Sequence, residues 1–123
     1  MIKQELEKIA KKLWDICCYL KWGRTCNACK KNKASCNHHF FPRSISKYLK
    51  FDINNGVPVC TSCHTGIHWR NDPRVVENII DYRGRSWYNK LTKEKEKGEK
   101  LGSFYNKEFL EEEIKKLEKY YNR

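Results

Sequence analysis

The chain has 123 residues, 39% of them hydrophobic and four of them Trp, a composition that excludes wholesale disorder and fits one small domain. Lys and Arg total 26 against 15 Asp and Glu, so the formal net charge is +11 and the first candidate partner is nucleic acid. No apolar run approaches the length of a bilayer span, and the N-terminus has no signal-peptide core. We therefore expect a cytoplasmic protein that does not bind a membrane.

Residues 2–21 are predicted to form an amphipathic helix, because their apolar side chains recur at alternating steps of four and three. The stripe comprises Ile2, Leu6, Ile9, Leu13, Ile16 and Leu20. Gly23 follows at the position of a left-handed helix cap, and Cys17 fits the apolar face as a buried thiol. The stripe can pack on the C-terminal helix or the metal core of the same chain, or on a second copy in a short coiled coil.

Four of the seven Cys form two Cys-x-x-Cys pairs, which are Cys26 with Cys29 and Cys60 with Cys63. Two pairs at this spacing can offer four thiolates to one tetrahedral ion, so they predict a structural Zn²⁺ site rather than a disulfide framework. The alternative is a redox-active pair, which two pairs flanking a His pair make less favourable. Cys36 lies between the pairs and is a competing ligand.

Two short strands are predicted around the histidine pair. The first spans residues 34–41 and holds His38 and His39, whose side chains point to opposite faces of a regular strand. Both cannot then be ligands of one ion, and different roles are expected for them. A loop with an Asn55-Gly56 turn signal leads into the second strand, residues 57–59.

A second histidine pair follows the last Cys-x-x-Cys. We expect the chain to be helical after Cys63 through about Trp69. His64 and His68 are four positions apart, so in a helix both imidazoles project from one face. The His38-His39 segment is the expected partner of that face.

Two further helices are predicted, at residues 73–82 and 106–121. The last one carries an apolar stripe of the same period as the first helix, and we expect the two to pair antiparallel. The charge-mixed run at residues 93–100 is interpreted as an exposed helix end or a linker.

Basic residues between the two strands are candidates for contacts with phosphates. They are Arg43, Lys47 and Lys50. The alternative for all three is ordinary solvated surface charge. The lysines on the polar faces of the first helix are expected to be solvated surface rather than a binding site, namely Lys3, Lys8, Lys11 and Lys12.

The order of these segments resembles the HNH, or ββα-metal, nucleases over roughly Cys26 to Trp69. The chain is similar to zinc-bearing HNH enzymes, including phage recombination endonucleases of the NinG (Rap) type. It departs from that type at His64, where the type has Asn, and at His38, where it has an aliphatic residue or Gly. The His64 and His68 pair is more similar to the colicin-type DNases. Three blocks carry the resemblance: His38-His39-Phe40-Phe41-Pro42, Asn55-Gly56-Val57-Pro58-Val59-Cys60 and Cys63-His64-x-x-x-His68.

The resemblance implies that His39 is the general base and that a catalytic divalent ion is held by His38, His64 and His68. It also implies that Asn55 fixes the loop and orients His39. Phosphodiester hydrolysis suits this set, because imidazole can deprotonate water near neutral pH and a cation neutralises charge on the phosphate. Three imidazoles favour Zn²⁺, Ni²⁺ or Mn²⁺ over Mg²⁺, which prefers oxygen ligands.

The predicted fold class is α+β, a zinc-stapled ββα-metal core flanked by N- and C-terminal helices. We expect one domain over residues 1–123. It divides into an N-terminal helix at 1–22, the zinc and ββα-metal core at 23–91, and a charged linker with the C-terminal helix at 92–123.

The predicted function is metal-dependent hydrolysis of DNA, in phage recombination or on branched DNA, in the cytoplasm of the host cell if the chain is phage-encoded. The alternative is a zinc-ribbon module that binds nucleic acid without cutting it. The terminal helices permit a homodimer, which would suit cleavage of two strands at a junction.

Overall fold

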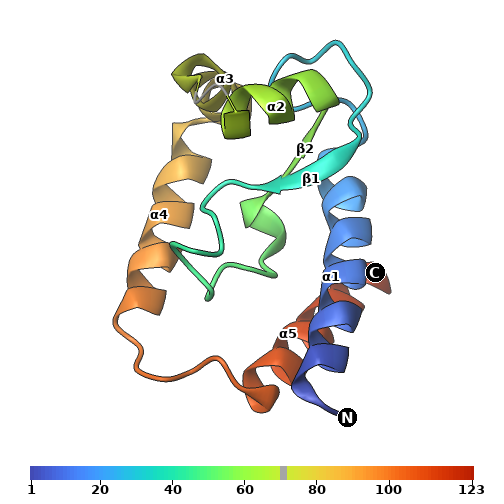
Figure 1. Cartoon of the computed structure of the whole chain (residues 1–123), viewed down its shortest axis with the longest axis vertical. Helices are drawn as coiled ribbons and strands as arrows, with labels where there is room; N and C mark the ends of the chain where they lie inside the picture. The colour runs from blue at the N-terminus through green and yellow to red at the C-terminus, as the bar shows by residue number, and fades with distance from the viewer. Residues whose placement is uncertain (70–71) are drawn as a thin grey trace.

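The computed structural model describes residues 1–69 and 72–123, except for the side chains of His68 and Trp69. In this part of the chain five α-helices surround a two-stranded antiparallel sheet, which confirms the α+β class (Figure 1). None of the described helices combines the length and the apolar character needed to cross a membrane. The elements are α1 (Lys3–Trp22), β1 (Cys36–His39), the 3-10 turn η1 (Ile53–Asn55), β2 (Gly56–Val59), α2 (Thr61–Trp69), α3 (Pro73–Arg83), α4 (Arg85–Glu99) and α5 (Lys107–Tyr121).

The face that helix α1 buries overlaps only partly with the predicted one: Leu6 and Cys17 are buried as predicted. Most of the aliphatic stripe is exposed, including Ile9 and Ile16. The helix packs against both α5 and the sheet, so its buried face is wide and is centred on the small Ala10 and the large Trp14. The residues that it buries are Leu6, Ala10, Trp14, Cys17 and Cys18. The helix ends at Gly23, which has a φ of 82°.

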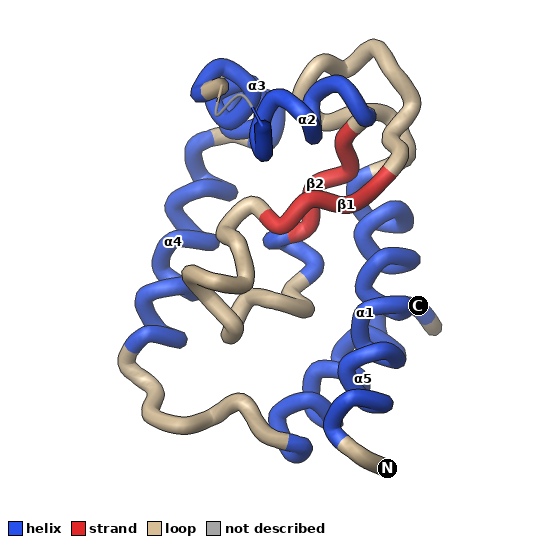
Figure 2. Tube along the Cα trace, viewed as in Figure 1, coloured by secondary structure: helices blue, strands red, loops and turns tan. Residues whose placement is uncertain are grey.

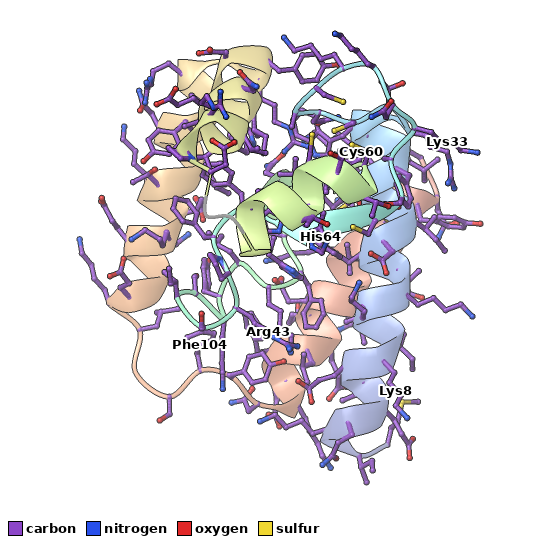
Figure 3. All side chains as sticks on the ribbon, turned by 45° about the horizontal axis from the view of Figure 1, so that its top comes forward. Lys8, Lys33, Arg43, Cys60, His64 and Phe104 are labelled. Carbon is purple, nitrogen blue, oxygen red and sulfur yellow. The ribbon has the colours of Figure 1, made fainter. Side chains whose placement is uncertain are left out.

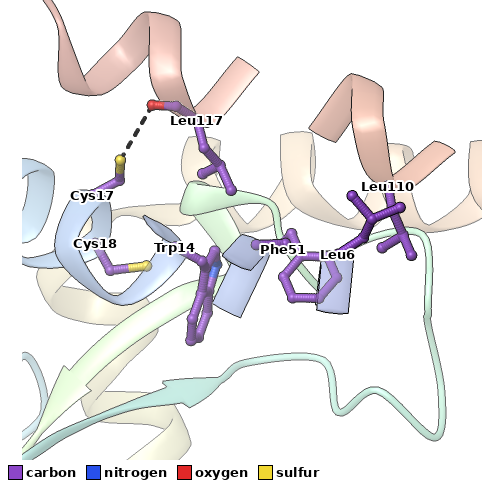
Figure 4. Packing of buried hydrophobic residues seen from close by; sticks show 8 residues of the cluster. Leu6, Trp14, Cys17, Cys18, Phe51, Leu110 and Leu117 are labelled. Atoms are coloured by element: carbon purple, nitrogen blue, oxygen red, sulfur yellow. Dashed lines mark hydrogen bonds between the residues drawn. The ribbon is translucent and has the colours of Figure 1, made fainter. Parts of the chain in front are cut away.

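Helices α1 and α5 run in the same direction, so the predicted antiparallel pairing is wrong. Tyr105, just before α5, donates a hydrogen bond to Glu7 near the start of α1. Further along both helices, the Cys17 thiol lies 3.5 Å from the carbonyl oxygen of Leu117 (Figure 4). The parallel arrangement is possible because α4 and the segment 100–106 carry the chain back to the N-terminal end of α1 (Figure 1). A homodimer through the terminal helices stays a prediction.

The two strands pair in a register that sets His38 opposite Val57 and His39 opposite Gly56. The predicted Asn-Gly turn is wrong, because the chain forms η1 there and Gly56 has an extended φ of −90°. Glycine is needed at this position for close packing: a Cβ would lie 2.2 Å from the Cys18 sulfur and 2.9 Å from Trp14. A long loop connects β1 to η1 (Figure 2).

Helices α2, α3 and α5 begin and end close to the predicted positions, whereas α4 was not predicted as a helix. Asp72 caps α3 by accepting a hydrogen bond from Arg74 N–H, and the helix ends before Gly84. Helix α4 then continues through Glu99, so the charged run is a helix end rather than a linker. The apolar face of α4 contacts the core through Leu91.

Candidate metal centre and histidine pocket

Four thiols converge at the end of β2. Cys26 and Cys29 come from the turn after α1, Cys60 follows β2, and Cys63 lies in the first turn of α2. All four sulfur atoms lie within 4.8 Å of one another. The Cys29 and Cys60 sulfurs are 3.9 Å apart, close to the edge of about 3.8 Å that a tetrahedron with Zn–S bonds of about 2.3 Å requires. The four residues therefore fit a tetrahedral zinc ion.

Hydrogen bonds favour the thiolate form of two of the four cysteines, Cys60 and Cys29, whereas burial and the neighbouring Cys60 and Cys26 raise the pKa of Cys63. Burial opposes ionisation of Cys60, but hydrogen bonds from Cys63 N–H and from the Asn32 amide lower its pKa to about 6. The pKa of Cys29 is also lowered, chiefly by the backbone N–H of Asn32. Thiolates are the form that binds zinc, so the surroundings of these side chains suit a metal as well as their distances do.

The other three cysteines lie in the sheet or in the hydrophobic core, away from the four clustered thiols. Cys36 pairs with Val59 in the sheet and lies outside the four-thiol cluster. Cys17 and Cys18 are fully buried in the core between α1, η1 and α5. Burial raises the pKa of the Cys18 thiol, which keeps it protonated.

A pocket of about 390 Å³ lies between the sheet, α1 and α2. Its walls bring His38 and His39 on β1 together with His64 on α2, which lies 25 or more positions further along the chain. The rings of His38 and His64 meet edge to face with their centroids 5.7 Å apart. Figure 3 shows His64 on the side of α2 that faces β1, with Arg43 below it. The lining residues are Lys11, Asn37, His38, His39, Pro42, Arg43, Ser44 and His64.

The His39 side chain points toward α1, and two contacts fix the orientation of its ring. Its ring stacks on Trp14 with centroids 4.3 Å apart and an interplanar angle of 8°. Its Nε2 atom lies 2.9 Å from the carbonyl oxygen of Lys50. A carbonyl only accepts, so Nε2 carries the proton in the neutral ring and Nδ1 is the acceptor nitrogen. Burial lowers the pKa of His39, which favours this neutral form.

Asn55 is fully buried and ties the two ends of the long loop together. Its side-chain oxygen accepts from Phe41 N–H at 2.8 Å, and its amide donates to the carbonyls of Phe41 and Leu49, each at 3.1 Å. Leu49 immediately precedes Lys50, whose carbonyl binds His39. Asn55 thus fixes the part of the loop that orients the His39 ring.

The Lys50 side chain binds two other side chains of the protein. Its ammonium lies 3.1 Å from Glu7 and 3.1 Å from the Tyr105 hydroxyl, and Tyr105 in turn donates to Glu7. Lys47 lies over the Tyr105 ring, 5.2 Å from its centroid. Arg43 is the member of the predicted basic set that lines the histidine pocket.

His68 lies one turn after His64 on α2, but its side chain is outside the described residues. Its predicted role as a ligand stays a prediction.

Sequence reasoning missed three residues that contact or line the site. Trp14 stacks on the histidine, Lys11 lines the pocket, and Glu7 anchors Lys50. Trp14 had a signal, because a large aromatic side chain one turn from Ala10 and near Cys17 on a helix marks a buried face. The contacts of Lys11 and Glu7 depend on tertiary packing.

Comparisons with models of protein families, with curated proteins and with solved structures found no match. The four-thiol cluster and the histidine pocket are therefore the features of the chain that point to a function.

Proposed function

We propose that this chain is a metal-dependent endonuclease of the HNH type that hydrolyses DNA phosphodiester bonds. One observation carries the proposal: the rings of His38 and His64 meet in the same pocket that His39 lines, and His39 is held through Nε2. Hydrolysis needs ligands for a cation and a separate base, and this pocket offers both from neighbouring side chains.

In the proposed reaction, the Nδ1 atom of His39 accepts a proton from water. The water oxygen forms a bond to phosphorus, the bond to the leaving sugar oxygen breaks, and that oxygen takes a proton from solvent. Trp14 and the Lys50 carbonyl hold the imidazole in one orientation and one tautomer, so that the acceptor nitrogen stays available.

His38 and His64 are the described residues that would hold the divalent ion. A bound cation supplies charge neutralisation on the phosphate and on the leaving oxygen. Imidazole ligands suit Zn²⁺, Ni²⁺ or Mn²⁺ better than Mg²⁺. The four-thiol site has a different part in the proposal, which is to bind a structural Zn²⁺ that joins the turn after α1 to β2 and α2.

The formal charge of +11 supports DNA as the substrate, because a cationic protein gains affinity for the phosphate backbone through counterion release. The resemblance to phage recombination endonucleases makes branched DNA the first substrate to compare with linear duplex. A labelled junction, a flap and a linear duplex of equal length would rank these shapes by cleavage rate.

The direct test is cleavage of supercoiled plasmid by zinc-loaded protein with Mg²⁺, Mn²⁺ or Ni²⁺ added in turn. We expect nicked and linear products with at least one of these ions. Plasmid that stays supercoiled with every ion, while the protein retains zinc and still binds DNA, would contradict the proposal and favour a zinc-ribbon binding module.

A further inference from the structure

A second hollow runs along α1 and opens beside the histidine pocket. Its volume is about 560 Å³, and we call it the α1 groove. Lys11 and Arg43 line both the groove and the histidine pocket, so the two hollows meet at these side chains. Helix α1 supplies most of the remaining wall, including Lys8 and Lys12. In Figure 3, His64, Arg43 and Lys8 follow one another down the molecule.

The α1 groove carries excess positive charge. Its walls hold five basic side chains and two acidic ones, which are Glu7 and Asp15. Glu7 is neutralised locally, because its carboxylate receives the Lys50 ammonium and the Tyr105 hydroxyl. Asp15 likewise pairs with Lys11 at 2.7 Å.

The remaining cations of the groove are Lys8, Lys12 and Arg43. Within the described residues, none of the three has an ion pair with a carboxylate. All three are exposed. Their charge is therefore available to an anionic ligand.

We propose that the α1 groove binds the sugar-phosphate backbone of DNA to one side of the bond cut in the histidine pocket. Lys8 and Lys12 are one helical turn apart, about 6 Å along the axis, so they can contact neighbouring phosphates. Arg43 sits where the groove meets the pocket and would contact a phosphate close to the cleaved one. This inference deepens the proposed function and rests on it.

The assignment differs from what the sequence predicted. The lysines of α1 were expected to be solvated surface, and Lys50 was one of three candidates for contact with phosphate. In the structure Lys50 is held by Glu7 and Tyr105, whereas Lys8 and Lys12 line a hollow continuous with the histidine pocket.

The test is a double substitution, Lys8→Gln with Lys12→Gln, compared with Lys93→Gln with Lys97→Gln on the exposed side of α4. Both pairs remove two charges from exposed helical lysines, so net charge and helix propensity change equally. Binding of a fluorescein-labelled duplex is measured by anisotropy over a range of NaCl concentrations, in zinc-loaded protein with no second divalent ion added.

We expect the groove variant to reduce the magnitude of the slope of log K against log salt by about 1.8, because each phosphate contact to duplex DNA contributes about 0.9. The α4 variant should retain the parent slope. Equal slopes for both variants would overturn the inference. The assay follows binding alone, so failure of the groove is distinguished from failure of the proposed function, which plasmid cleavage by the parent protein reports.

Discussion

The Nε2 atom of His39 lies 2.9 Å from the carbonyl oxygen of Lys50, and this contact joins the sheet to the long loop that follows it. The loop carbonyl fixes which ring nitrogen carries the proton. The Lys50 side chain extends the link to α1 through Glu7 and to the start of α5 through Tyr105. The terminal helices thus help to orient a histidine in the sheet.

Replacing Asn55 with Ala should loosen this loop. The substitution removes three hydrogen bonds and leaves backbone groups of the half-buried Phe41 and the buried Leu49 without their partner. We expect the free energy of unfolding to fall by about 3 kcal/mol, measured by urea denaturation. Asn54→Ala, at the exposed neighbouring position, is the control and should cost less than about 1 kcal/mol. Equal losses for the two variants would contradict the role given to Asn55.

Replacing Gly56 with Ala should overpack the contact between α1 and β2. The added Cβ would meet the Cys18 sulfur and the Trp14 ring, and such overpacking typically costs about 1 to 3 kcal/mol. Adding Cys18→Ala should recover part of the loss, because it removes the nearest atom. Gly102→Ala is the control, since a Cβ at Gly102 meets nothing within 4 Å. The melting temperatures of the parent, the two single core variants, the double variant and the control test this account, and strictly additive effects at the two core positions would count against it.

The contribution of Glu7 should depend on pH. The hydrogen bond from Tyr105, with help from Lys50, lowers the pKa of Glu7 below its usual 4.5. A carboxylate with a depressed folded-state pKa stabilises the protein above pH 4.5, and this stabilisation is lost as pH falls through the folded-state pKa. Glu7→Gln should therefore cost about 1 kcal/mol at pH 7 and nothing once wild-type Glu7 is protonated in both states.

Urea denaturation at pH 7 and at progressively lower pH measures this difference. Glu111→Gln, at an exposed position of α5, is the control and should show little difference at either end of the range. A loss of stability in Glu7→Gln that grows on acidification would contradict a lowered pKa of Glu7 in the folded protein.

If the four thiols bind zinc, replacing Cys60 and replacing Cys36 should have different effects on zinc content and on thermal unfolding. Cys60→Ser removes one of the four clustered thiols, whereas Cys36→Ser changes a thiol outside the cluster. Structural zinc contributes its binding free energy to folding, so Cys60→Ser should lose both bound zinc and the cooperative thermal transition. Cys36→Ser should keep one zinc per chain. Metal analysis and calorimetry measure both outcomes, and a Cys60→Ser protein that melts like its parent would refute the zinc site.

The sequence was informative wherever the determinant was local. Cys-x-x-Cys spacing and thiolate chemistry predicted the four thiols that the structure brings together. The helical stretch after Cys63 and the Pro73 start of α3 were also predicted from local patterns. Each Cys-x-x-Cys pair and each helix start depends on residues within a few positions of one another, whereas the meeting of the two pairs joins segments more than 30 positions apart.

Features that depend on tertiary packing were not predictable in this way. Packing against both α5 and the sheet determines which face of α1 is buried. The spacing of the aliphatic residues therefore did not reveal that Trp14 is buried. The direction of α5 depends on how far α4 carries the chain. The engagement of Lys50 requires Glu7, 43 positions away, so no local pattern could reveal it.

The Asn55-Gly56 pair shows a third kind of error. The dipeptide is a strong turn signal, yet here each residue meets a packing requirement: Asn55 bridges a loop, and Gly56 leaves room for Cys18. The Asn-Gly dipeptide here meets packing requirements set by residues distant in sequence, and it does not form a tight turn.

The measurement that tests the central claim most directly is single-turnover cleavage of DNA by His39→Ala, with parent protein and the same divalent ion alongside. Losing a general base should lower the rate constant by about 10²- to 10⁴-fold, while DNA affinity and bound zinc stay at parental values. Cleavage by His39→Ala at the parental rate would contradict the account.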